Sequence, residues 1–181
     1  MNEYWKIAGA MILPNLGGFV NGQITRNNLQ NWYKNLKFPA YRPPNWVFAP
    51  VWTSLYSGMG YASYLVWRDG GGFTGDAKLP LLAYGTQLAL NWAWTPIFFG
   101  QRNIKGGLID IVALTATATA CGALFYSVNK VAGYIFIPYV AWLSFASLLN
   151  FSIFQLNPDT ENTNDKAIEP AQEEKEPVNK K

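Results

Sequence analysis

The placement of charge constrains this chain more than any other feature of its sequence. Five long segments contain no Asp, Glu, Lys or Arg, namely residues 7–25, 43–67, 79–101, 111–129 and 131–158. A helix needs about 20 mostly apolar residues to cross a bilayer, and each segment is close to that length or longer. We therefore predict an all-α membrane protein, a bundle of five transmembrane helices.

The composition supports a membrane protein over the soluble and barrel alternatives. Only 14% of the residues are charged, against about a quarter in a typical soluble domain. Helices buried in a soluble protein rarely stay uncharged all round, and a barrel would show alternating segments of about 10 residues, which are absent.

The charge-free segments divide the chain into a transmembrane domain, residues 1–156, and a tail, residues 157–181. The tail contains seven acidic residues, four lysines and no aromatic residue, and we expect it to be disordered. Within the domain, helices are expected at about residues 5–25, 45–67, 79–100, 106–128 and 131–156.

The residue inventory excludes several kinds of chemistry. The chain has no histidine, which excludes a His-ligated metal and a Ser-His-Asp triad. Its one cysteine, Cys121, can form no internal disulfide and has no histidine to activate it as a nucleophile. We expect no metal, no cofactor and no nucleic-acid partner.

The polar residues inside the charge-free segments that bear on function are neutral amides. They are Asn15, Asn21, Gln87, Asn91 and Asn150. Their neutrality excludes a Schiff-base lysine and a carboxylate proton relay in the membrane. One acid, Asp110, stands at the expected start of the fourth helix, where we expect its carboxylate to cap the positive end of the helix dipole.

The first connection, residues 26–45, is the longest between helices. It carries four basic residues, no acid and four aromatic residues. A merely solvated loop would not need the aromatic residues, so we expect this one to fold back over the bundle mouth or to lie among the lipid headgroups.

Basic residues near the helix ends predict the orientation. One side holds Arg26, Lys34, Lys37, Arg42, Arg102 and Lys105; the other holds Lys6, Arg68, Lys78 and Lys130. The positive-inside tendency then places the first and third connections and the C-terminus in the cytosol.

Gly18 and Gly22 have the spacing that lets helix backbones approach closely. We favour packing within the chain as its explanation, and a homodimer is the alternative.

Large aromatic residues deep in the helices form two stripes. Phe48 and Trp52 share a face of the second helix, and Trp142, Ala146 and Leu149 share a face of the fifth. Large rings beside small residues can line a cleft for a flat, apolar ligand. Tight helix packing explains the same pattern equally well.

Runs rich in proline and tryptophan cover most of the chain before the tail. They are FP at residues 38–39, RPPNWVFAPVW at 42–52, YSGMGY at 56–61, QLALNWAWTPIFFG at 87–100, PYVAW at 138–142 and LLN at 148–150. Together they resemble the signature of the translocator protein family, also called peripheral-type benzodiazepine receptors or tryptophan-rich sensory proteins.

The resemblance implies a five-helix bundle that binds porphyrins, sterols such as cholesterol, and synthetic benzodiazepine or isoquinoline drugs. In animals it implies the mitochondrial outer membrane. Transport or metabolism of these ligands is the implied role, with membrane lipid as a further partner. The ligand-binding positions that it implies are Ala49, Val51, Trp52, Trp94, Trp142, Ala146 and Leu149.

Two alternative functions remain. Bacterial relatives degrade porphyrin in light with two tryptophans whose counterparts resemble Trp52 and Trp142, so these are candidate redox residues, although no catalytic residue is established. A mitochondrial scaffold that uses the basic first connection and the acidic tail is the other alternative.

The chain also departs from the family pattern at two places. Gly106 stands where mammalian members have a tryptophan that covers the pocket, so that lid contact is missing. In the sterol-recognition stretch, Asn150 is followed by Phe151 and Gln155 where the pattern has tyrosine and arginine. We therefore expect sterol binding there to be weak.

Overall fold

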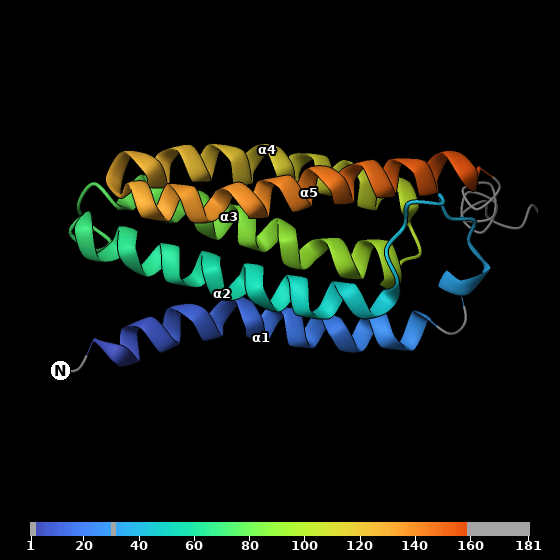
Figure 1. The fold of residues 1–181 in the computed structure, drawn as a ribbon, viewed down its shortest axis with the longest axis horizontal. Helices are drawn as coiled ribbons and strands as arrows, with labels where there is room; N and C mark the ends of the chain where they lie inside the picture. The colour runs from blue at the N-terminus through green and yellow to red at the C-terminus, as the bar shows by residue number, and fades with distance from the viewer. Residues whose placement is uncertain (1–2, 30–31, 159–181) are drawn as a thin grey trace, which may run out of the picture.

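The computed structural model, which describes residues 3–29 and 32–158, confirms the predicted fold class (Figure 1). Its described part is all-helical, with five long helices. They are α1 (Tyr4–Leu29), α2 (Asn45–Asp69), α3 (Lys78–Thr95), α4 (Ile104–Val128) and α5 (Lys130–Leu156). Two short turns accompany them, the 3₁₀ turn η1 (Tyr33–Asn35) and the π-helical turn η2 (Pro96–Gly100). The predicted tail lies outside the described residues from position 159 onward.

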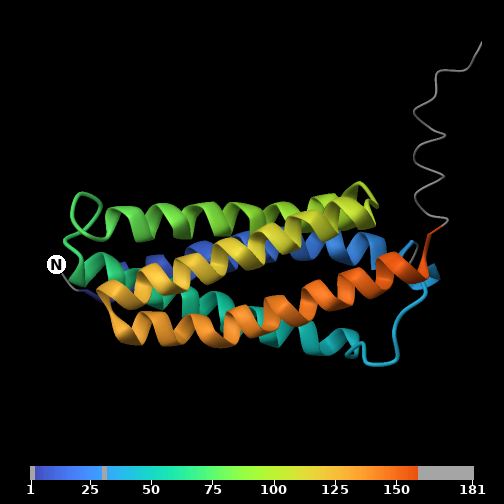
Figure 2. The same ribbon diagram turned by 90° about the horizontal axis from the view of Figure 1, so that it is seen from above.

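The helices form a closed ring in the order α1, α2, α5, α4, α3. The most extensive contacts join α4 to α5, α1 to α2, α3 to α4 and α2 to α5, and α1 closes the ring against α3 and η2. The beginning of α1 and the end of α5 lie at opposite ends of the bundle, as an odd number of spans requires (Figures 1 and 2). The first loop lies at the same end as the end of α5.

Asparagine side chains define where the last two helices begin. Asn103 Oδ1 accepts a hydrogen bond from the Gly106 N–H at 2.6 Å, and Asn129 Oδ1 accepts one from the Ala132 N–H at 3.0 Å. Each side chain satisfies a backbone donor that the first helical turn leaves unpaired. The chain therefore turns from α4 to α5 through Asn129 alone.

The third helix does not continue as a regular α-helix to residue 100 as predicted. It ends at Thr95, and η2 takes over at Pro96. Proline has no N–H, so the Trp92 carbonyl loses the donor that residue 96 would supply in an α-helix. The Asn21 side chain replaces it, because its Nδ2 donates to Trp92 O at 3.0 Å. The hydrogen bond lost at Pro96 is thus replaced by one from an amide in α1.

The bundle has an apolar and aromatic core that also holds a few buried amides, and its outer surface is largely apolar. The side chains of Gln87, Asn91 and Asn150 are 0%, 4% and 2% exposed, whereas large apolar side chains such as Leu82 and Ile109 cover the outer surface. In the described part of the chain, α4 and α5 are apolar enough by length and composition to cross a membrane, with mean hydropathies of 1.8 and 1.6. This distribution suits contact with lipid, where interior polar groups must bond to one another.

Gly60 lets α1 and α2 approach closely. A Cβ atom added there would lie 2.4 Å from Ala10 O and 2.7 Å from Met11 Cα. The Ala10 carbonyl has no helical donor because residue 14, four positions along, is a proline. Glycine at position 60 therefore leaves room for the Ala10 carbonyl, whose helical hydrogen bond Pro14 removes.

We predict that Gly60→Ala destabilises the bundle by about 1–3 kcal/mol, because the added methyl group meets rigid backbone. Gly85→Ala is the matched control, since a Cβ at Gly85 meets no atom within 4 Å. Alanine also favours a helix over glycine by roughly 0.5–1 kcal/mol. Thermal unfolding in detergent micelles should give a lower midpoint for Gly60→Ala and an equal or higher one for Gly85→Ala. Equal midpoints for the Gly60→Ala variant and the parent would contradict the close approach.

Candidate ligand cavity

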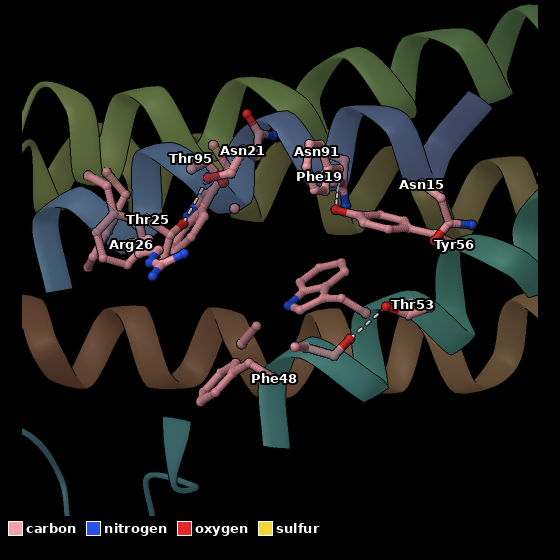
Figure 3. A pocket seen from close by; sticks show the side chains of 18 of the residues that line it. Asn15, Phe19, Asn21, Thr25, Arg26, Phe48, Thr53, Tyr56, Asn91 and Thr95 are labelled. Carbon is pink, nitrogen blue, oxygen red and sulfur yellow. Dashed lines mark hydrogen bonds between the residues drawn. The ribbon is translucent and has the colours of Figure 1, made fainter. Parts of the chain in front are cut away.

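A cavity of about 1040 Å³ opens among the helices in the half of the bundle nearer the first loop. Its lining is mostly apolar and aromatic, with a few amides and hydroxyls. Figure 3 shows Tyr56, Asn91 and Asn15 at one end of it and Arg26 and Thr25 at the other. Phe19 and Thr53, both exposed, border the cavity, so it reaches the molecular surface between α1 and α2.

The structure places six of the seven predicted ligand-binding residues around this cavity. They are Ala49, Trp52, Trp94, Trp142, Ala146 and Leu149. Val51 is not among the lining residues. It follows Pro50 on α2, and one helical step of about 100° separates it from Trp52 on the helix surface.

Tryptophan rings from α2 and α5 meet at one wall. The rings of Trp52 and Trp142 lie edge to face, with centroids 6.5 Å apart and an interplanar angle of 86°. Phe48, which belongs to the stripe predicted on α2, packs edge-on against Trp142 at 5.9 Å. This geometry is the favourable one for aromatic pairs.

Another part of the wall contains a stacked pair and an amide. The rings of Trp94 and Phe98 are stacked at 4.7 Å with an interplanar angle of 16°. Trp94 Nε1 donates to Asn150 Oδ1 at 3.1 Å, and Asn150 Nδ2 donates to the carbonyl of Ile104 at 3.1 Å. One buried amide thereby joins α3, α4 and α5 beside the cavity.

A chain of hydrogen bonds begins at the deep end of the cavity and runs into the bundle. Tyr56 Oη donates to Asn91 Oδ1 at 2.7 Å, and Asn91 Nδ2 donates to Tyr139 Oη at 3.0 Å. Tyr139 Oη then donates to Gln87 Oε1 at 2.8 Å, and Gln87 Nε2 contacts Met59 Sδ at 3.7 Å. These bonds satisfy polar groups that are buried in the bundle.

The first loop folds back over the bundle end, which confirms one of the two positions expected for it. Tyr33 and Leu36 are buried there, and Tyr33 packs on Phe99 with ring centroids 5.1 Å apart. Asn157 fastens the loop to the end of α5: its Oδ1 accepts from the Lys37 N–H at 2.9 Å, and its Nδ2 donates to Lys37 O at 3.0 Å.

The residues of the predicted sterol stretch face different directions. Asn150 is buried and lines the cavity, whereas Phe151 and Gln155 are exposed on the outer surface of α5. Phe151 and Gln155 lie four residues apart and share one helix face.

Gly106, at the position of the family's covering tryptophan, is not among the residues that line the cavity.

The expectation that Asp110 caps α4 is wrong. The helix begins two residues earlier than predicted, at Ile104, and Asn103 is its cap. Asp110 therefore lies in the second turn, 8% exposed, and its Oδ2 has no hydrogen-bond partner among the described residues. Within residues 3–29 and 32–158, no group of three acids or cysteines could hold a metal ion.

Sequence reasoning missed the contribution of α1. Asn15, Gly18, Gly22 and Arg26 recur at intervals of three and four residues and all line the cavity. This helical periodicity was the available signal. Of the two glycines of the predicted packing motif, Gly18 packs within the chain, because a Cβ there would lie 2.4 Å from the ring of Tyr56, whereas a Cβ at Gly22 meets no atom within 4 Å.

Five helices around an aromatic cavity, two of them long and apolar enough to cross a membrane, define a helical bundle with an interior site. Comparison with known proteins identifies the family to which this bundle belongs. The model of the TspO/MBR family matches residues 10–156, and the chain belongs to this family.

Its relatives come from animals and microorganisms. The chain is 44% identical over 149 residues to the translocator proteins of Bos taurus and Homo sapiens, and each match covers 82% of this chain and 88% of the relative. It is 39% identical over 152 residues to the tryptophan-rich protein TspO of Archaeoglobus fulgidus, covering 84% and 97%. The resemblance predicted from the proline- and tryptophan-rich runs is thus confirmed.

Proposed function

We propose that this protein binds porphyrins, sterols such as cholesterol, and benzodiazepine- or isoquinoline-type drugs in the membrane, and facilitates their transport or metabolism. The observation that carries the proposal is that six residues predicted to bind ligand surround one cavity of about 1040 Å³. Ligand sites typically have about 300–1,000 Å³ and a mostly apolar lining with a few placed polar groups. A flat macrocycle fits this description.

The aromatic walls supply the contacts that a porphyrin needs. Trp52 and Trp142 border the cavity from α2 and α5, and Trp94 borders it from α3. A porphyrin in the cavity would contact these aromatic rings, each contact being worth about 0.5–1.5 kcal/mol beyond the burial of area.

Sterol binding is proposed at a different place, the outer face of α5. Phe151 and Gln155 are exposed there, where a membrane sterol can reach them. Phe151 offers a ring but no hydroxyl, and Gln155 offers no charge, so the contact is expected to be weak.

Light- or oxidant-dependent degradation of porphyrin is the second candidate function. The contact between the Trp52 and Trp142 rings favours it, because a porphyrin in the cavity would lie beside two electron-rich indoles. An indole can donate an electron to an excited porphyrin, which would make these two residues redox-active.

The location is proposed to be the mitochondrial outer membrane, with the C-terminus in the cytosol. The basic residues of the first and third loops support this orientation. The animal relatives named translocator protein support the assignment to the same class of membrane protein.

We predict that Gly22→Leu weakens porphyrin binding about tenfold or more without unfolding the bundle. Gly22 lines the cavity, and a Cβ there meets no atom within 4 Å, so a leucine side chain would occupy space that the ligand needs. Quenching of tryptophan fluorescence by protoporphyrin IX in darkness measures the affinity. Gly85→Leu, at a glycine equally open but outside the cavity, should bind as the parent does. Unchanged binding by Gly22→Leu would place the porphyrin elsewhere.

We predict that Trp52→Leu and Trp142→Leu each weaken dark porphyrin binding roughly 2- to 10-fold through loss of ring contacts. Trp5→Leu is the control, since Trp5 is 78% exposed and does not line the cavity. If the two indoles also degrade porphyrin, both variants lose the light-dependent products at porphyrin concentrations that saturate them. Equal product yields from parent and variants would reject the redox function and leave the binding function standing.

The orientation is tested with single cysteines in a Cys121→Ala background. Lys34→Cys and Pro158→Cys lie at one end of the bundle and Phe73→Cys lies in the loop at the other, and all three positions are exposed. A maleimide polymer too large to pass the pores of the outer membrane should label only the first two in intact mitochondria. Labelling of Phe73→Cys alone would show that the orientation is the reverse of the one proposed.

A further inference from the structure

Arg26 is the one charged side chain among the described residues that line the cavity. It lies in the last turn of α1, on the helix face that also carries Gly22 and Asn15. Figure 3 shows it at the end of the cavity away from Tyr56. The helix dipole favours a cation in the last turn, but it does not determine which face of the helix carries that cation. The position of Arg26 on the face toward the cavity is therefore not explained by the dipole.

No acid in the described part of the chain neutralises Arg26. The one ion pair found there joins Arg68 to Asp69. Of the other described acids, Glu3 and Asp76 lie toward the opposite end of the bundle, and Asp110 is buried in α4 outside the cavity lining. The positive charge at the cavity therefore has no counter-charge from residues 3–29 and 32–158.

Arg42, a neighbouring arginine, shows the contrast. Its guanidinium lies 4.3 Å from the ring centroid of Phe38 and 5.2 Å from that of Tyr33, and it donates hydrogen bonds to Tyr33 Oη and to Asn45 Oδ1. Through these contacts Arg42 stabilises the first loop. Arg26 makes no such contact with the described residues, so its guanidinium donors are unpaired there.

We propose that Arg26 binds the anionic group of the ligand, so that the cavity selects flat apolar molecules that carry a carboxylate. The planar guanidinium can donate two parallel hydrogen bonds to a carboxylate. The apolar body would then lie along the cavity against the tryptophans, while the charged group stays at the end nearest the aqueous interface. This proposal rests on the proposed function and names the ligand class within it: porphyrin carboxylic acids over their neutral esters.

The test compares protoporphyrin IX with its dimethyl ester, which keeps the macrocycle and removes both charges. Affinities are measured in darkness in nanodiscs of neutral lipid, so that the lipid charge does not select the probe. The parent should bind the acid roughly 2- to 5-fold more tightly than the ester, the range expected of an exposed charged contact. Arg26→Gln should remove this preference by weakening the acid alone. Arg26→Lys, which keeps the charge and loses the fork, should retain part of it.

Arg102→Gln is the matched control. Arg102 is exposed at the same end of the bundle and does not line the large cavity, so its replacement removes the same net charge and should leave the preference unchanged. An equal loss in Arg102→Gln would show that net charge alone selects the acid, which overturns the proposal. Equal binding of acid and ester by the parent, or an unchanged preference in Arg26→Gln, would overturn it as well.

A second probe separates failure of this proposal from failure of the proposed function. If the parent binds neither porphyrin, porphyrin binding is rejected, and pyrenebutyrate and its methyl ester then test Arg26 by the same comparison. Tighter binding of the pyrene acid that disappears in Arg26→Gln would support the anionic site. Binding of acid and ester with equal affinity would overturn it.

Discussion

The interior of this bundle depends on the hydrogen-bonded chain that joins Tyr56, Asn91, Tyr139 and Gln87. It links α2, α3 and α5, and its members are buried. A lipid-facing bundle gains little from sequestering apolar side chains, since the surrounding medium is equally apolar. Polar groups inside such a bundle have no competing water, so a complete set of partners favours one arrangement of the helices. The cavity begins where this chain ends, at Tyr56.

Two prolines show how irregular backbone is tolerated in such a bundle. Pro14 and Pro96 each remove a donor from a helix, and each freed carbonyl lies against another helix. The carbonyl of Trp92 accepts a bond from Asn21, and that of Ala10 faces Gly60. Both compensations tie α1 to its neighbours, and the resulting π turn at Pro96 carries Phe98 and Phe99 to the cavity wall.

The sequence predicted the number of helices because charge is excluded from membrane spans by a large free-energy cost. Part of the cavity wall was also predicted, since Trp52, Trp142 and Leu149 line the cavity and lie on faces that helical periodicity and the family resemblance indicated. The sequence did not locate the α1 wall, because glycine and asparagine carry little hydrophobic signal. The role predicted for Asp110 is wrong because the true cap, Asn103, lies before residue 106, where the charge pattern predicts the helix to begin. Contacts distant in sequence, such as Asn21 with Trp92, cannot be read from a local pattern.

The opening of the cavity between α1 and α2 bears on the rate at which a ligand can enter. Phe19 and Thr53 border the opening on the outer surface of the bundle, which is otherwise covered by apolar side chains. A ligand that enters there must first dissolve in the bilayer, and each CH₂ group favours that transfer by about 0.8 kcal/mol. The rate of association by this route then follows the amount of ligand per lipid rather than the amount per volume of water. Two ligands with equal aqueous concentrations would enter the cavity at rates that differ by the ratio of their partition coefficients.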